Sequence, residues 1–177
     1  SKLLSLSFES NEYIHQNQWD WMEFTAKPPT ERYEGSMVMI KTFDKKKKLF
    51  VAGGNNNKAD IYDFQHNQWD SVDGEWEKKR VGMCYSHGKQ TIYICHTKRV
   101  VKSYDITKNK WTDLPHSWMD HYHWWKPTMW INKCNNNLLF IASFRHKNGL
   151  EFMDLRECKT WNIVKYGDNH GIFKEQS

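Results

Sequence analysis

Apolar and polar positions alternate in short runs along the chain, and these runs recur in a fixed order. Trp19, Trp69, Trp111 and Trp161 lie 42 to 50 residues apart, and each follows a short polar turn. Upstream of the turn comes an alternating segment, such as "ADIYDF" or "VKSYDI", and before it an apolar run, such as "KLFVAGG" or "TIYICH". Three of the four copies carry one more apolar run before that: "GSMVMI", "VGMCYS" and "PTMWIN". The order predicts four short strands in each complete unit.

Each run is too short for a stable helix and has the length of a strand. The turns between runs are rich in Asn, Asp, Lys and Gly, as hairpin turns are. A four-stranded antiparallel unit that repeats about every 45 residues is typical of a β-propeller blade. We therefore expect an all-β fold in which a single domain over residues 1–177 contains an incomplete first blade at 1–24 and full blades at about 32–74, 80–114 and 124–166.

The order of residues within each unit resembles the kelch motif, in which a double glycine ends one strand and Tyr-Asp, a turn and Trp follow. "LFVAGG" with "IYDFQHNQW" carries the whole motif, and Arg32 and Arg80 resemble the arginine that precedes the family's first strand. The dipeptide "WD", which ends two of the turns, does not indicate a WD40 repeat, because no Gly-His pair stands in register upstream. The resemblance covers about three and a half repeats. The partial copies keep Tyr13 and Trp19, then Tyr104, Asp105 and Trp111, then Asp154 and Trp161.

The motif residues have a structural explanation. Gly53 and Gly54 end a strand where we expect a positive φ or close packing. Tyr62 and Trp69 are expected on adjacent outer strands, packed against the next blade. Aromatic residues make up 15% of the chain, with ten tryptophans, and their wide rings fill the space between neighbouring sheets at a low cost in side-chain entropy. These residues define a scaffold rather than a ligand site.

The number of blades is the least determined feature of the fold. Propellers that resemble this chain usually close with about five to seven blades. Three interpretations follow: the chain is a fragment of a larger propeller, two chains complete one ring as a homo-oligomer, or the chain closes alone as a small ring. In the last case the tail "GIFKEQS" would supply a strand of the incomplete first blade.

Charge and cysteine usage narrow the class of function. The formal net charge of +5 favours acidic partners. No apolar run approaches the roughly 18 residues of a membrane-spanning helix, and no secretory signal pattern opens the chain. The four cysteines form no C-x-x-C pair, which argues against a zinc site and leaves either free thiols or two disulfides. These features favour a cytoplasmic location and predict no cofactor, no metal and no membrane partner.

The order of the strands determines at which of the two ends of a blade each loop lies. The loops between second and third strands and the loops between blades share one end, which we call the loop end. Lysine and arginine gather there, and arginine can hold a carboxylate with two hydrogen bonds. We therefore expect a non-catalytic module that docks an acidic peptide or protein partner, and the kelch resemblance implies the same face. The expected partner-binding residues are Arg32, Asn55, Lys58, Lys79, Arg80, Lys98, Arg99, Tyr122, Arg145, His146 and Lys147.

Two other segments carry candidate chemistry. The run "DKKKKL", residues 44–49, falls in a turn at the opposite end, and a solvated hairpin tip explains it best, because four lysines alone give little affinity for nucleic acid. The segment from His116 to Trp125 places His121 and His123 two residues apart, on one side of an extended strand. A propeller enzyme or a metal-dependent binder that uses this segment is the alternative function. No catalytic motif occurs, and we expect no enzyme.

Overall fold

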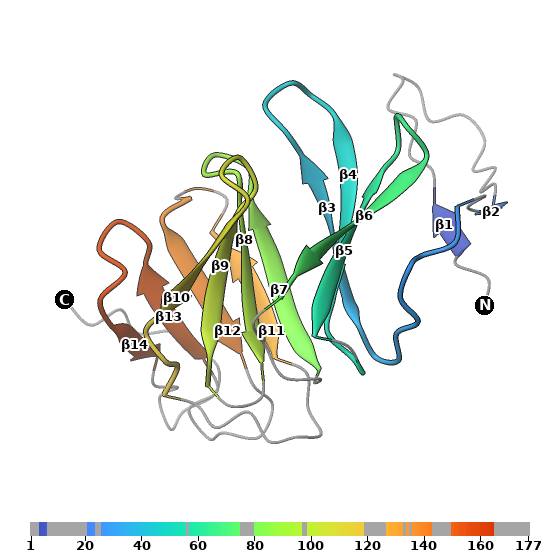
Figure 1. Ribbon diagram of the computed structural model, residues 1–177. Helices are drawn as coiled ribbons and strands as arrows, with labels where there is room; N and C mark the ends of the chain where they lie inside the picture. Colours follow the sequence, from blue (N-terminus) through green and yellow to red (C-terminus); the bar gives the residue numbers. More distant parts are fainter. Residues whose placement is uncertain are drawn as a thin grey trace, which may run out of the picture.

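The structure is a computed structural model, and it describes residues 4–6, 21–23, 26–55, 57–74, 80–96, 99–118, 127–132, 134, 136–142 and 150–164. Three four-stranded antiparallel sheets hold most of the strands in this part of the chain. The described residues contain no helix, and so none of a length that could span a membrane. The prediction of an all-β fold built from four-stranded antiparallel units is confirmed. Within the described residues the sheets do not close into a ring (Figure 1).

Each of the three sheets is one blade, and its strands follow one another in chain order. Blade 1 contains β3 (Ser36–Lys41), β4 (Lys47–Ala52), β5 (Lys58–Asp63) and β6 (Gln68–Asp73). Blade 2 contains β7 (Val81–Ser86), β8 (Thr91–His96), β9 (Val101–Asp105) and β10 (Lys110–Leu114). Blade 3 contains β11 (Thr128–Ile131), β12 (Leu138–Ala142), β13 (Leu150–Asp154) and β14 (Trp161–Val164). A separate two-stranded sheet pairs β1 (Leu4–Leu6) with β2 (Trp21–Glu23).

The blades stack around their first strands. β7 lies between β3 and β11, and the Ser36 hydroxyl at the start of β3 donates a hydrogen bond to the Val81 carbonyl at the start of β7. The fourth strands, β6, β10 and β14, form the far edge of each sheet (Figure 1). Neighbouring blades come closest through these first strands, so the space between two neighbouring sheets is a wedge that is narrowest there.

Two apolar cores fill the wedges. Between blades 1 and 2, Ile40 and Phe50 pack with Ile92 and Ile94. All four side chains are buried, and each contributes roughly 1.5–3 kcal/mol by leaving water. A second core lies between blades 2 and 3, and it includes Cys84, Tyr93, Cys95, Leu139, Ile141, Met153 and Trp161. The cores lie between sheets rather than within them, so a blade depends on its neighbours for its stability.

The turn between third and fourth strands explains the Tyr-Asp-turn-Trp order. In blade 2, Asp105 Oδ1 accepts hydrogen bonds from the backbone N–H groups of Thr107 and Lys108, at 2.9 and 3.1 Å. Asn109 then adopts a positive φ of 51°, a conformation that asparagine tolerates well. The Tyr104 hydroxyl donates to Asn109 Oδ1 at 2.6 Å and ties the two strands together. The Thr107 hydroxyl, with Lys108 and these N–H groups, lowers the pKa of Asp105 to about 2.

The recurring tryptophan joins each blade to the unit that precedes it. Its indole N–H donates a hydrogen bond to a backbone carbonyl at or just after the end of the preceding unit's last strand. The ring of Trp111 also lies 6.4 Å from that of Phe50, in blade 1. The prediction that Tyr62 and Trp69 pack against the next blade is therefore wrong in direction, because this side of a blade faces backward along the chain. The three bonds join Trp69 to Ala26, Trp111 to Asp73 and Trp161 to Pro115, at 3.1, 2.8 and 2.8 Å.

The double glycine behaves as its sequence predicts. Gly53 and Gly54 have φ angles of 81° and 80°, which residues with a side chain rarely adopt. A Cβ atom on Gly54 would lie 2.2 Å from the Tyr33 carbonyl oxygen. The pair thus lets β4 end in close contact with the segment that leads into β3. Both parts of the expectation, positive φ and close packing, are confirmed.

Candidate docking surface

The loop end is held together by hydrogen bonds between the two kinds of loop that it contains. The guanidinium of Arg32, in the segment before blade 1, donates to the Gly53 carbonyl at 3.0 Å. The Tyr33 N–H donates to Asn55 Oδ1 at 3.4 Å. In blade 2 the Ser117 N–H donates to the Arg99 carbonyl at 2.9 Å. The segments between blades therefore lie directly over the second-to-third loops.

Arg32 forms a buried ion pair at the centre of this end in blade 1. Its Nε and Nη2 atoms lie 3.2 and 2.7 Å from Asp60 Oδ2, and the two side chains are only 7% and 1% exposed. Asp60 Oδ1 also accepts a hydrogen bond from the Ser71 hydroxyl at 2.9 Å. Arg32 thus fastens the segment before the blade to β5. Its predicted contact with a partner carboxylate stays a prediction.

The other two blades carry a buried charged residue near the start of the third strand, as Asp60 is in blade 1. Lys102 is the second residue of β9, and its Nζ lies 2.6 Å from Asp113 Oδ1 in β10. Glu151 is the second residue of β13 and accepts a hydrogen bond from the Ser117 hydroxyl at 2.8 Å. These buried charges were not predicted from the sequence. The available signal was a charged side chain near the start of the third strand in each of three units.

Two more of the predicted partner-binding residues, Lys58 and Arg80, form ion pairs with acidic side chains of this chain. Lys58 Nζ is 3.6 Å from Asp73 Oδ1, on an exposed part of blade 1. Arg80, at the start of blade 2, forms an ion pair with Glu34, and a hydrogen bond from Arg80 lowers the pKa of Glu34. Exposed pairs of this kind contribute little to stability. The other six predicted residues lie outside the described part of the chain: Lys79, Lys98, Tyr122, Arg145, His146 and Lys147.

A cleft of about 390 Å³ lies at the loop end of blade 1. The segment that precedes β3 forms one wall with Lys27, Arg32 and the exposed Tyr33. Met37 and Trp69 from the blade form the other. The cleft combines basic and acidic groups, because Glu31 and Asp60 also line it, with aromatic and apolar side chains, a composition suited to an extended peptide. We call it the loop-end cleft.

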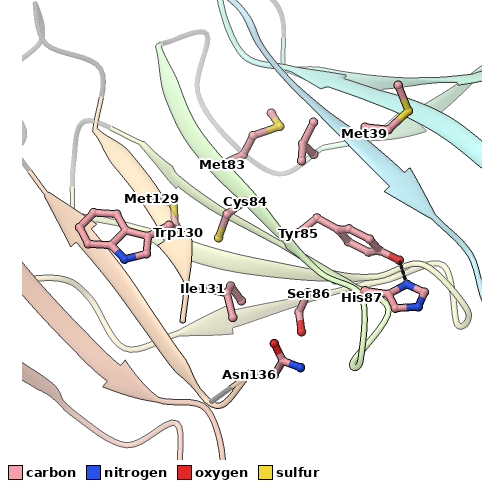
Figure 2. Close-up of a pocket in the computed structure, with 11 residues that line it drawn as sticks. Met39, Met83, Cys84, Tyr85, Ser86, His87, Met129, Trp130, Ile131 and Asn136 are labelled. Atoms are coloured by element: carbon pink, nitrogen blue, oxygen red, sulfur yellow. Dashed lines mark hydrogen bonds between the residues drawn. The ribbon is translucent and has the colours of Figure 1, made fainter. Parts of the chain in front are cut away.

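A second hollow, of about 450 Å³, runs along the first strands (Figure 2). Met39, Met83 and Trp130 supply much of its apolar lining, from β3, β7 and β11 respectively. At one end of it, the Tyr85 hydroxyl and His87 Nδ1 lie 2.5 and 2.7 Å from the carbonyl oxygen of Lys41, the last residue of β3. These two contacts fix the first-to-second turns of neighbouring blades against each other. None of the predicted partner-binding residues lines this hollow.

The alternative site from His116 to Trp125 falls largely outside the described residues. His116 and Trp118 are exposed within the described part, and the Trp118 indole donates to the Trp161 carbonyl at 3.2 Å. Residues 119–126, which include His121 and His123, are not described. Across the ranges that the structure covers, no cluster of three His, Cys, Asp or Glu side chains is arranged to hold a metal ion.

Sheets of four antiparallel strands, stacked through their first strands, give the chain a β-propeller-like fold. Solved structures support this class at the level of the fold. A chain of the nidogen/laminin complex is 8% identical, with a TM-score of 0.61 over 85% of this chain and 54% of that one. Hydrazine synthase from Kuenenia stuttgartiensis is 14% identical, with a TM-score of 0.53 over 72% of this chain and 36% of that one.

The chain is much shorter than both of these solved chains. It spans between about a third and about half of the length of these two solved chains. No known sequence family and no curated protein matches the sequence. Because both identities are below about 25%, the likeness defines the fold and leaves the function to the chain's own residues.

Proposed function

We propose that this chain is a kelch-like propeller segment that acts as a non-catalytic binding module, and that its loop end docks an acidic segment of a protein partner. The observation that carries the proposal is the convergence of loops at this end. Arg32 and Tyr33 reach Gly53 and Asn55 through hydrogen bonds, and the resulting loop-end cleft is lined by aromatic side chains and by both basic and acidic ones. Propellers commonly bind partners through such loops because the blades beneath hold them in place.

The kelch-like assignment is supported by the role that each motif residue has in the fold. Asp105 organises the turn, Asn109 provides its positive φ, and Trp111 joins the blade to its neighbour. Gly53 and Gly54 fit their position by their φ angles. A motif whose spacing matches these contacts is stronger support than the letters alone.

At the loop end, a carboxylate of a partner could take the place of a carboxylate of this chain in an exposed ion pair. Lys58 and Arg80 face Asp73 and Glu34 at exposed positions, where each ion pair is weak. A partner carboxylate that arrives with several others would replace them at little cost. By contrast, the buried pair of Arg32 and Asp60 would stay intact and keep the loop-end cleft in shape.

A charge-reversal experiment tests the proposal with an oligo-glutamate peptide that carries a fluorophore. One variant changes Lys58, Arg80 and Arg99 to Glu at the loop end. A matched control changes Lys45, Lys46 and Lys47 to Glu in the turn between β3 and β4, so that the net charge is the same. We expect the loop-end variant to bind at least about tenfold more weakly, as read from fluorescence anisotropy, while the control binds like the unmodified chain.

Two results would contradict the proposal. Equal losses in both variants would indicate that the peptide senses only net charge. Unchanged binding in the loop-end variant would place the contact elsewhere. Circular dichroism of each variant checks that the sheets remain folded.

A further inference from the structure

The hollow along the first strands has the volume and the lining of a small-molecule site. Its volume of about 450 Å³ lies within the range of about 300–1,000 Å³ that is usual for ligand pockets. β3, β7 and β11 supply most of the eleven residues that line it, so that all three blades contribute (Figure 2). Among these described residues none is Lys, Arg, Asp or Glu, although charged residues make up 27% of the chain. A lining of this composition favours a neutral ligand.

The apolar part of the lining is suited to an aromatic ring. Met39, Met83 and Met129 line the hollow, one from each of the three strands, and methionine sulfur makes favourable contacts with aromatic rings. The ring of Trp130 is 38% exposed and can stack with a planar ligand. Trp130 also stacks with Phe140, with centroids 5.3 Å apart and planes at 4°, and this contact fixes its orientation. A ring that is held in place in advance loses less entropy when a ligand binds.

One buried hydroxyl gives the hollow a specific position for a hydrogen bond. The Ser86 side chain is only 2% exposed, and its Oγ has no hydrogen-bond partner in the described part of the chain. Buried hydroxyls are normally paired, so an unpaired one in the wall of a hollow points to a bound partner. In Figure 2 this hydroxyl points toward Asn136, an exposed residue whose side chain can turn aside to admit a ligand.

We propose that the hollow binds a neutral, planar aromatic molecule that carries one hydroxyl group, such as a phenol. The aromatic ring lies among the methionines and against Trp130. The hydroxyl of the ligand forms a hydrogen bond with the Ser86 hydroxyl, which can both donate and accept. The hollow and the loop-end cleft share no lining residue among those described, so this binding does not depend on the docking of an acidic partner.

Equilibrium dialysis with 2-naphthol and naphthalene tests the proposal, because the two probes share a ring system and differ by one hydroxyl group. We expect the unmodified chain to bind 2-naphthol more tightly than naphthalene. Ser86→Ala should weaken the binding of 2-naphthol about fivefold, the worth of one hydrogen bond, without weakening that of naphthalene. Ser103→Ala, in β9, is the matched control, since Ser103 does not line the hollow, and it should leave both affinities unchanged.

Two methionines of β3 show where the probes bind. Met39 lines the hollow and Met37 lines the loop-end cleft, and the two side chains are 50% and 58% exposed. Met39→Glu should weaken the binding of both probes at least about tenfold, because a carboxylate would stand against an apolar ring, whereas Met37→Glu should not. Circular dichroism checks that each variant is folded.

Three results would overturn the proposal. The first is an unmodified chain that binds neither probe. The second is a Ser86→Ala variant that loses affinity for both probes equally or keeps its full affinity for 2-naphthol. The third is binding that Met39→Glu leaves intact or that Met37→Glu weakens to the same extent.

Discussion

The tryptophan that recurs in this sequence performs two tasks with one side chain. The ring of Trp111 packs near Phe50 of the preceding blade, and its indole N–H donates to the Asp73 carbonyl at 2.8 Å. A phenylalanine would supply the first contact without the second. This double role accounts for a tryptophan at a position where any large apolar residue would fill the wedge.

Replacement of Trp111 by Phe should separate the two tasks. We expect the free energy of unfolding to fall by about 1–2 kcal/mol, since the Asp73 carbonyl loses its donor while most of the ring contact remains. Urea denaturation followed by circular dichroism measures the change. Trp130→Phe is the matched control, because no hydrogen bond of its indole is found in the described structure, and it should cost less. Equal costs would show that ring volume alone matters.

At the scale of single residues, the turn chemistry was predictable and the buried charges were not. The sequence "SYDITKNKW" places Asp and Asn at the positions where the turn between β9 and β10 needs them. Asp60, Lys102 and Glu151 escaped notice because a charged residue in a strand normally indicates a solvent-facing position. Their partners can lie far along the chain, as Arg32 does from Asp60, so that no local pattern reveals the pairing. For the same reason, the sequence predicted a binding role for Arg32 and not its structural role in the ion pair with Asp60.

At the scale of elements, close contact between strands and the segments that join blades sets the spacing of the sheets. A Cβ atom on Gly82, in β7, would lie 2.1 Å from the Pro127 carbonyl oxygen just before β11. Backbone groups have little freedom to move away. The first strands of blades 2 and 3 therefore approach more closely than any side chain at this position would allow.

Gly82→Ala should destabilise the protein by roughly 1–3 kcal/mol, because the added methyl group forces the two blades apart. Gly88→Ala provides the control, since its Cβ would have its nearest neighbour at 3.6 Å, the Asn136 side chain. We expect this second variant to be as stable as the unmodified chain in urea denaturation. If both alanine variants had equal stability, the close approach at Pro127 would not constrain the blades.

The strands themselves were predictable because alternation and turn residues agree in each complete repeat. The direction in which the tryptophans pack was not, since period-2 alternation assigns residues to two faces without saying which neighbour each face meets. The number of blades in a closed ring cannot be predicted from the sequence of one repeat, for a similar reason. Each blade contacts only its neighbours, and the contact between blades 1 and 2 would have the same residues in a ring of any size.

At the scale of the whole molecule, the core between blades 2 and 3 makes thiol chemistry a measure of the separation of these two blades. Cys84 and Cys95 are buried between blades 2 and 3, and burial raises the pKa of Cys84 to about 12. Burial also raises the pKa of Cys95. Cys134 is exposed, and all four cysteines are free thiols in the structure. Cys84 also lines the hollow along the first strands, whereas Cys95 is fully buried. Only unfolding or separation of blades 2 and 3 therefore gives a reagent access to Cys95.

Alkylation with iodoacetamide near neutral pH should therefore proceed in distinct phases. Cys134 should react first, and Cys95 should react only as fast as the blades separate, because a buried protonated thiol is a poor nucleophile. Mass spectrometry of digested samples assigns each modification, and a sample in urea gives the rate for exposed thiols. Labelling of Cys95 at the rate of Cys134 in native buffer would contradict the packing of blades 2 and 3.

The indole hydrogen bonds also bear on the order in which the blades can assemble during synthesis. Trp69, Trp111 and Trp161 each donate to a carbonyl that stands earlier in the sequence. During synthesis on the ribosome, which proceeds from the N-terminus, every one of these tryptophans therefore emerges after its acceptor. A newly made blade can attach to the one before it at once, without waiting for the rest of the chain.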